Sequence, residues 1–344
     1  MAFHKDTQIM TDTGWKRIKD IKGFDKVLVR NFLGEAHLMQ PFAIELIKFR
    51  GRIHCLGNSY WNIKLSPRHE VIGFRKGKEC RSQVRKLSPY QAGARFVFDR
   101  TATYVSEEEY KADMFTVWGK GFKKVKKMPP EDWYVLAAFI LQRAMIYKTA
   151  MSKFGRGDIQ ISLNRKKEPE AFLILQDILN RAEIQFKEKG DRTIVISKRN
   201  TLFSLIKRRL GSWKREEMSI PLDMTYKGSK ELVQSFIDTL RLLSKRDTKR
   251  FNNNIIAGYD KMISSLEIMC YVHGIKAARS STIKSTSLDG EPKETLRFGQ
   301  YGQLASVIFH TDDKNDSHNV YAVDILEGQV LARNEGYGVW VPPR

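Results

Sequence analysis

Cysteine, signal-like segments and long apolar runs are all scarce in this chain of 344 residues, and each scarcity excludes a class of protein. The three cysteines, Cys55, Cys80 and Cys270, form no CxxC pair, so a disulfide framework is not expected. No apolar run reaches the roughly 18 residues of a membrane span, and the N-terminal stretch MAFHKDTQIM lacks the apolar core of a secretory signal. We therefore expect an intracellular protein, cytoplasmic or nucleoid-associated, with no membrane partner; a phage origin is left open.

Acidic residues are the minority charge. The chain has 39 Asp and Glu against 60 Lys and Arg, which gives a formal net charge of +21. An excess of this size is typical of proteins that bind a polyanion, most often nucleic acid. The alternative is a soluble protein with many surface lysines and no such partner.

Hydrophobic patterning divides the chain into an outer and a middle part. The first hundred residues contain short runs of Val, Ile and aromatic residues between Gly, Asn and Pro, which predicts β-strands. Residues 118–132 hold five lysines, two glycines and Pro129-Pro130, which predicts a linker. The tail after residue 319 returns to β character. The pattern predicts a β-rich domain, formed by 1–127 and 302–344, that is interrupted by an inserted α+β domain over 128–301.

The middle part contains two similar halves, about 132–211 and 229–301. Each half opens on a helix with a seam of small residues and continues with strand-like and helical stretches. The first half is expected to open on a helix over 132–150 and to end at a helix closed by Gly211. In the second half, Ser229 is a candidate cap for a helix from 230, and a further helix is expected over 255–274. Because both halves lie on one chain, we expect an internal pseudo-two-fold and a monomer.

Five stretches match motifs of one known family. In the outer part, FHKDTQIMTDTGWKRIKDI contains Asp6-Thr7-Gln8-Ile9, KLSPRHEVIGF contains Ser66 to His69, and VYAVDILEGQVLARNEGYGVWV resembles a closing splicing block. In the middle part, LAAFILQRAMI and FIDTLRLLSK resemble two LAGLIDADG helices. In order and spacing, the chain resembles an intein that carries a LAGLIDADG homing endonuclease. The resemblance implies a β-rich, Hint-like horseshoe domain with an inserted α+β domain of two pseudo-symmetric repeats.

The resemblance places the splicing positions on Ala2, Thr7, Ser66 and His69. The family's first residue is a nucleophilic cysteine, and its last is an asparagine that cyclises. Here Ala2 has neither thiol nor hydroxyl, and the chain ends in Val341-Pro342-Pro343-Arg344. We therefore expect splicing to be defective and His69 to be a packed histidine. An engineered Cys→Ala change at residue 2 is an open alternative.

The resemblance also places the DNA-cleaving acids, one near the end of each LAGLIDADG helix, on Arg143 and Ser244. Ala138 and Thr239 fall where small residues let these two helices cross closely. Family members hold Mg²⁺ with the two acids, but a guanidinium repels Mg²⁺ and a single hydroxyl binds it weakly. No metal or cofactor is therefore expected, and Mg²⁺ only if residual nuclease activity exists through Asp238 or Asp247. Arg143 is expected to donate to a DNA phosphate or, alternatively, to extend into solvent at a helix end.

Double-stranded DNA is the partner that the resemblance implies, since family members lay a saddle of strands along the major groove. The candidate DNA-binding residues are Gln160, Asn164, Arg165, Lys167, Lys198, Arg199, Arg279, Lys284, Arg297 and Gln300. For any one of them a solvated strand face is an equal alternative. We predict an intein-derived DNA-binding protein defective in splicing and cleavage. The alternatives are an active Mg²⁺-dependent homing endonuclease with atypical ligands and a relic reused as a structural or assembly subunit, so enzyme activity stays open.

Overall fold

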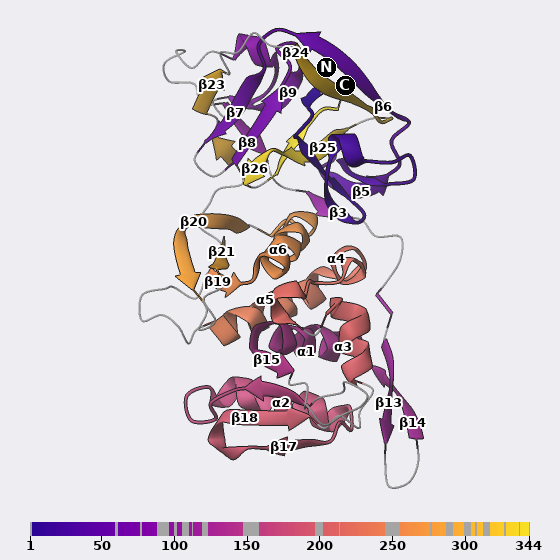
Figure 1. Ribbon diagram of the computed structural model, residues 1–344, viewed down its shortest axis with the longest axis vertical. Helices are drawn as coiled ribbons and strands as arrows, with labels where there is room; N and C mark the ends of the chain where they lie inside the picture. The colour runs from indigo at the N-terminus through magenta and orange to yellow at the C-terminus, as the bar shows by residue number, and fades with distance from the viewer. Residues whose placement is uncertain are drawn as a thin grey trace. The chain divides into compact units, whose positions relative to one another are not determined.

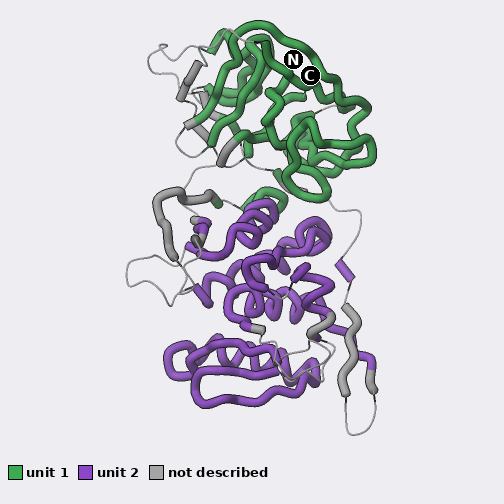
Figure 2. Tube along the Cα trace, viewed as in Figure 1, with its two compact units in different colours: residues 1–106, 270–281, 298–344 green, residues 107–269, 282–297 purple. Residues whose placement is uncertain are grey.

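A computed structural model of the chain gives its architecture. The structure describes residues 2–58, 61–75, 78–87, 96–99, 102–104, 110–111, 113–118, 123–146, 158–196, 202–212, 214–244, 255–275, 277–286, 292–298, 304–306, 308–311, 317–326, 328–336 and 338–343. Two compact units are present (Figure 2). The outer unit comprises 1–106, 270–281 and 298–344, and the middle unit comprises 107–269 and 282–297. Residues 107–127 thus group with the middle unit and not with the predicted outer domain, and residues 270–281 and 298–301 group with the outer unit and not with the predicted inserted domain. In the described part of the chain, no helix is both long and apolar enough to cross a membrane.

The outer unit is built of short strands from both ends of the chain (Figure 1). From the N-terminal segment these are β1 (Phe3–His4), β2 (Gln8–Thr11), β3 (Gly14–Arg17), β4 (Val27–Arg30), β5 (Glu35–Met39), β6 (Ala43–Arg50), β7 (His54–Asn58), β8 (Trp61–Leu65), β9 (Glu70–Arg75), β10 (Lys78–Gln83), β11 (Phe96–Asp99) and β12 (Thr103–Tyr104). From the C-terminal segment they are β22 (Leu304–Ser306), β23 (Ile308–Thr311), β24 (Ser317–Asp324), β25 (Gln329–Arg333), β26 (Glu335–Gly336) and β27 (Val339–Val341). Single 3-10 turns follow β3 and β10, at Ile18–Asp20 and Val84–Lys86.

Strands from the two chain ends alternate within the sheets of this unit. One sheet has the order β23-β7-β8-β1-β24-β6 with β26 on β8, a second has β12-β5-β4-β2-β25-β27 with β3 on β2, and a third has β10-β9-β11-β22. β1 pairs antiparallel with β24, and β2 pairs antiparallel with β25. The core includes the fully buried Phe3, Trp61 and Trp340. Packing of the core therefore requires both ends of the chain.

The middle of the chain forms helices and short strands. The helices are α1 (Pro130–Arg143), α2 (Pro169–Arg181), α3 (Leu202–Leu210), α4 (Leu222–Lys227), α5 (Lys230–Ser244) and α6 (Asp260–Val272), with 3-10 turns at Gly190–Arg192 and Arg215–Glu217. The strands are β13 (Asp113–Trp118), β14 (Lys123–Met128), β15 (Ala144–Ile146), β16 (Ile159–Ser162), β17 (Phe186–Glu188), β18 (Thr193–Ile196), β19 (Ile255–Gly258), β20 (Ala277–Thr286) and β21 (Pro292–Phe298).

One pattern of strand order recurs in the two sheets that accompany the helices. The first sheet has the order β15-β16-β18-β17, and the second has β19-β21-β20. In the first, α2 lies in sequence between β16 and β17; in the second, α6 lies between β19 and β20. The helices that precede these sheets, α1 and α5, pack against each other. Two expected helix ends are present. Ser229 Oγ accepts from the Leu232 amide at the start of α5, and Gly211, with φ +78°, follows the end of α3.

Three predictions of local structure were wrong. The lysine-rich linker is the β13–β14 hairpin, in which Phe115 pairs with Lys126; Met128 is fully buried and anchors the end of β14. The helix expected over 132–150 ends at Arg143, because Ala144 adopts an extended conformation and starts β15. The helix expected from 255 begins at Asp260, since the preceding residues pair with β21 as β19. In each case strand pairing overrode local composition.

Candidate functional site

Helix α1 is buried along most of its length. Pro130 occupies its first turn, where a missing amide proton costs nothing, and Glu131 and Asp132 place negative charge at its positive end. The side chains from Trp133 to Leu141 are buried, except at position 135, and Arg143 is the last helical residue. An apolar helix of this kind stabilises a unit by packing on all sides.

Helix α5 packs on α1 through an apolar face. Val233, Phe236, Ile237, Leu240 and Leu243 recur at helical spacing and are buried. This spacing places them on one side of the helix, so α5 presents a continuous apolar surface to its neighbours.

The two residues predicted at the helix crossing are both buried. Ala138 has no exposed surface, and Thr239 turns its hydroxyl back onto its own helix, where Oγ1 donates to the Ser235 carbonyl at 2.8 Å. The rings of Tyr134 and Phe236 meet edge to face, with 6.3 Å between centroids. The contact between α1 and α5 at Tyr134 and Phe236 is therefore aromatic, and the roles of Ala138 and Thr239 at the crossing stay predictions.

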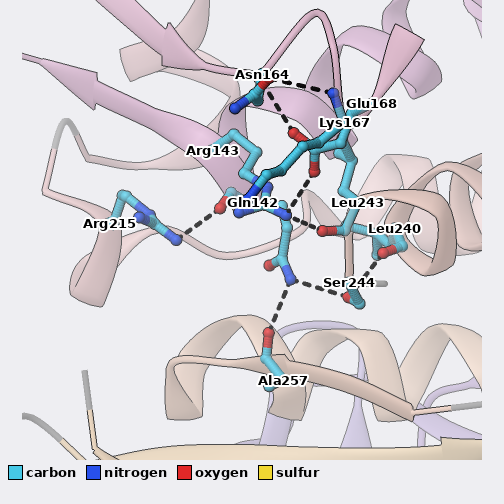
Figure 3. Close-up of polar contacts among 10 residues, drawn as sticks. All are labelled: Gln142, Arg143, Asn164, Lys167, Glu168, Arg215, Leu240, Leu243, Ser244 and Ala257. Carbon is cyan, nitrogen blue, oxygen red and sulfur yellow. Dashed lines mark hydrogen bonds and ion pairs between the residues drawn. The ribbon is translucent and has the colours of Figure 1, made fainter. Parts of the chain in front are cut away.

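The C-terminal ends of α1 and α5 meet, and with them the two predicted acid positions (Figure 3). The Gln142 amide donates from Nε2 to Ser244 Oγ and to the Ala257 carbonyl, at 3.0 Å each. Ser244 Oγ in turn donates to the Leu240 carbonyl at 2.8 Å. Arg143 donates from Nη2 to the Leu243 carbonyl. Arg143 thus bonds the residue before Ser244, and Ser244 bonds the residue before Arg143.

Arg143 is enclosed by protein groups. Its side chain is 16% exposed, and Nη2 also lies 3.3 Å from Oε1 of Glu168, which is 10% exposed. The structure therefore contradicts the alternative in which Arg143 extends into solvent. The predicted phosphate contact remains a prediction, and the ion pair with Glu168 competes with it for the same nitrogen.

Glu168 connects Arg143 to the start of α2. Its Oε2 accepts from the Asn164 amide at 3.0 Å, and its own amide donates to the Asn164 carbonyl at 2.7 Å. The Asn164 side chain also shapes this turn, because Oδ1 accepts from the amides of Lys166 and Lys167 at 3.1 Å. Sequence reasoning missed Glu168 and Gln142. The only sequence signal for Glu168 was its place before Pro169, where a helix begins.

The groups at this junction do not fit a Mg²⁺ site. Mg²⁺ in proteins is held by carboxylates and water, and the carboxylate beside Arg143 is already paired with a guanidinium. Asp238 accepts from Gln234 at 2.9 Å and from Arg241 at 3.0 Å, and Asp247 lies outside the described residues. Across the described ranges, no group of three or more His, Cys, Asp or Glu side chains could hold a metal.

The candidate DNA-binding residues fall into three groups. Gln160 is half-buried on β16, and the next residues of the set, Asn164, Arg165 and Lys167, lie on the turn after that strand. Arg165 is 55% exposed and pairs with Glu188 at 3.2 Å. The structure gives only the backbone position of Arg279 and Lys284 on β20 and of Arg297 on β21. The predicted residues Lys198, Arg199 and Gln300 lie outside the described residues.

Three of the four predicted splicing positions meet in the outer unit. The Ala2 amide donates to Ser66 Oγ at 3.2 Å, and the Ser66 amide donates to the Ala2 carbonyl at 3.0 Å. His69 is fully buried, with Nδ1 3.3 Å from the Ala2 carbonyl oxygen and Nε2 2.7 Å from that of Pro342. Thr7 is buried elsewhere and donates from Oγ1 to Asn334 Oδ1 at 3.1 Å. Both ends of the chain therefore reach one histidine.

Burial lowers the pKa of His69 to about 4, although its two carbonyl neighbours act in the opposite direction. The ring is therefore neutral near pH 7. A neutral imidazole carries one N–H, and the shorter contact favours its position on Nε2, toward Pro342. Beside it, Ala2 offers a methyl group where acyl transfer needs a thiol or hydroxyl.

The solved structures similar to this chain include two intein-type domains and a homing endonuclease. No protein-family model and no curated protein matches the sequence. The AceL NrdHF class 3 split intein, solved as a splice-inactive variant, is 18% identical with a TM-score of 0.25, over 37% of this chain and 71% of that one. A bacterial intein-like domain from Clostridium thermocellum is 26% identical with a TM-score of 0.24, over 28% of this chain and 66% of that one.

The homing endonuclease is a variant of I-DmoI solved in complex with its target DNA in the presence of Mg. It is 12% identical with a TM-score of 0.32, and the match covers 49% of this chain and 89% of that one. These kinds of protein are the two that the sequence motifs resemble.

Proposed function

We propose that this chain is an intein-derived protein whose middle unit binds double-stranded DNA without cutting it and whose outer unit no longer splices. The observation that carries the proposal is the Arg143 guanidinium at the junction of α1 and α5, bonded to Glu168 and to the Leu243 carbonyl. Hydrolysis of DNA by bound metals needs carboxylates that hold divalent cations against the phosphate. Here a guanidinium and the hydroxyl of Ser244 stand at the two positions.

The charge at this junction is balanced inside the chain. The last carbonyls of a helix carry partial negative charge, which a cation stabilises. Arg143 supplies that cation for the end of α5 and neutralises Glu168. A divalent ion would meet repulsion from the guanidinium, so we expect DNA binding that is independent of Mg²⁺.

DNA binding is supported by the net charge and by the polar face of β16. The chain carries a net charge of +21. On β16, Ile159 and Ile161 are buried while Gln160 and Ser162 are half-buried, so polar side chains share one face. The adjoining turn adds Arg165, Lys166 and Lys167, which sequence reasoning had included except for Lys166. Polar side chains can contact base edges while cations contact phosphates.

Two finer features belong to the same proposal. The shared order β16-β18-β17 and β19-β21-β20, with α1 packed on α5, supports two pseudo-symmetric repeats. Two such repeats on one chain would let a monomer cover the two halves of a duplex site. In the outer unit, the alternation of N- and C-terminal strands supports a Hint-like horseshoe.

The test is a titration of the full chain into random-sequence duplex at rising salt, with EDTA or with Mg²⁺, beside a nicking assay on supercoiled plasmid. We expect affinity that falls steeply with salt, that is equal in EDTA and Mg²⁺, and that is accompanied by no nicking. Mg²⁺-dependent nicking that is abolished by Asp238→Ala or Asp247→Ala would establish an active endonuclease instead. An absence of duplex binding at low salt would overturn the proposal and favour an assembly role.

The loss of splicing is tested with a reporter fused upstream of residue 2. We expect the fusion to stay intact in dithiothreitol, because Ala2 cannot form the thioester that a thiol would cleave. The Ala2→Cys variant is the matched control, since the Ser66 and His69 contacts around this position are present. Release of the reporter from the unmodified chain would contradict this part of the proposal.

A further inference from the structure

We propose that Arg143 and Glu168 act together as a positioning pair that holds the basic turn, residues 164–167, in the conformation that contacts DNA phosphates. The inference rests on the proposed DNA binding and assigns Arg143 a role different from direct phosphate contact. In this inference, the position at which the family has a DNA-cleaving acid supports a DNA-binding surface.

The first step is the anchoring of Arg143. Its Nη2 donates to the carbonyl of Leu243 near the end of α5, while its own backbone ends α1. The neighbouring residue, Gln142, bonds Ser244 through its side chain and accepts from Arg215 Nη2 at its carbonyl, at 2.7 Å. Contacts among α1, α5 and the 3-10 turn that begins at Arg215 thus fix the position of the guanidinium before any ligand binds.

The second step leads from Arg143 to the turn. The two oxygens of Glu168 have different partners: Oε1 lies 3.3 Å from Arg143 Nη2, and Oε2 accepts from the Asn164 amide at 3.0 Å. Figure 3 shows this chain of contacts from Arg143 through Glu168 to Asn164. Because Glu168 is only 10% exposed, water competes weakly for these bonds.

The third step is the turn itself. Oδ1 of Asn164 accepts from the amides of Lys166 and Lys167, so the backbone that carries the cations is bonded to the residue that Glu168 holds. The cationic side chains stay on the surface: Arg165 is 55% exposed and Lys166 is 83% exposed. Arg165 and Lys166 pair at the surface with Glu188 and Asp191, at 3.2 Å each, so a phosphate has to replace these exposed carboxylates. Buried partners therefore fix the backbone, while the charges are held in surface ion pairs that a polyanion can exchange.

The sign of one substitution separates positioning from simple electrostatics. Glu168→Gln removes a negative charge beside the basic turn, and on charge alone this change would strengthen DNA binding. If the carboxylate instead holds the turn, the same change weakens binding. Arg143→Met weakens binding in either case, so Glu168 is the decisive position.

The experiment measures duplex affinity and its salt dependence for the full chain and for Arg143→Met, Glu168→Gln and the double variant. We expect each single variant to bind about tenfold more weakly at moderate salt, with a salt slope lower by about 1 to 2 because phosphate contacts are lost. The double variant is expected to bind no more weakly than the weaker single one, since the pair acts as a unit. Arg143→Lys is expected to restore part of the affinity.

Stability is controlled in two ways. Tyr134→Phe removes a buried hydrogen bond to the Met224 carbonyl, 2.7 Å long and remote in sequence from the turn, and is expected to lower the melting temperature without changing DNA affinity. Hydrogen exchange at the Asn164 amide is expected to be faster in Glu168→Asp, a milder variant that serves if Glu168→Gln does not fold.

Two results are kept apart by this design. If the unmodified chain does not bind duplex, the proposed function fails. If it binds, and Glu168→Gln binds equally or more tightly while folded, the positioning pair is overturned and DNA binding stands. Additive losses in the double variant would likewise overturn the pair and indicate that Arg143 contacts phosphate itself.

Discussion

The Nε2 atom of His69 lies 2.7 Å from the carbonyl oxygen of Pro342, so a residue just before β9 bonds the C-terminal segment of the chain. The other ring nitrogen approaches the carbonyl of Ala2 at 3.3 Å. Because the ring is fully buried, this contact joins both chain ends inside the outer unit. Three positions that the motifs predict for splicing, Ala2, Ser66 and His69, thus lie together, and Ala2 has no nucleophilic atom in its side chain.

The buried histidine makes the free energy of unfolding of the outer unit depend on pH. The pKa of His69 falls from 6.5 to about 4 on burial, so the unfolded chain takes up the proton first as pH falls. The stabilisation is fully present above about pH 6.5 and is lost progressively toward pH 4, by about 3 kcal/mol in total. Glutamine can still donate to the Pro342 carbonyl but does not take up a proton in this pH range. We therefore expect His69→Gln to lose less stability than the unmodified chain as the pH falls.

Urea unfolding of both proteins over this pH range measures the effect. The difference between them is the relevant quantity, because burial also lowers the pKa of His4 and His54 in both chains. If the unfolding free energy has the same pH dependence in the two proteins, the pH-dependent stability does not come from His69.

The ion pair between Arg143 and Glu168 is expected to be costly to break from one side. Both side chains are largely buried, at 16% and 10% exposed, so removing one partner leaves the other charge without compensation. We expect Arg143→Met or Glu168→Leu to lower the free energy of unfolding by about 3 kcal/mol. Replacing both with apolar residues is expected to cost less than the sum. Denaturant unfolding of the four proteins gives the coupling, and strict additivity would show that the pair does not interact.

The basic turn is expected to contribute to the salt dependence of DNA binding. Replacing Arg165, Lys166 and Lys167 by Gln together is expected to lower the slope of log affinity against log salt by about 2 to 3, since each phosphate contact contributes about 0.9. A matched control replaces Arg17, Lys19 and Lys26, which are exposed cations of the outer unit. Equal changes in slope for the two triple variants would indicate a general charge effect.

Local signals in the sequence were sufficient to locate the two central helices. The apolar spacing of α5 and the serine before it predicted a helix from residue 230, and the structure has α5 over Lys230–Ser244. Correspondence between LAAFILQRAMI and FIDTLRLLSK placed Arg143 and Ser244 at equivalent positions, and each of them bonds the residue that precedes the other. Periodicity and capping act within a few residues, so the sequence shows them directly.

Contacts between separate segments could not be predicted from local patterns in the sequence. Glu168 reaches Arg143 because the turn after β16 returns toward the end of α1, and no local pattern specifies that path. The lysines of β14 were assigned to a linker because composition does not show that Phe115 pairs with Lys126. In both cases a pairing partner outside the immediate sequence neighbourhood decided the conformation, and the propensity of single residues does not specify that partner.

The predicted crossing of α1 and α5 at Ala138 can be tested by changing the size of this side chain. Ala138 has no exposed surface on a helix packed against α5, so a larger side chain has to displace its neighbours, and at the predicted crossing that neighbour is α5. We expect Ala138→Leu to destabilise the middle unit by about 1 to 3 kcal/mol through overpacking and to weaken DNA binding, because separated helices would no longer hold Arg143 against the Leu243 carbonyl. Ala138→Gly is the matched control: it keeps the space and is expected to cost only about 1 kcal/mol of helix propensity, with affinity retained. Denaturant unfolding and duplex titration on the same preparations measure both effects, and an Ala138→Leu variant as stable as the unmodified chain would show that this position is not a tight crossing.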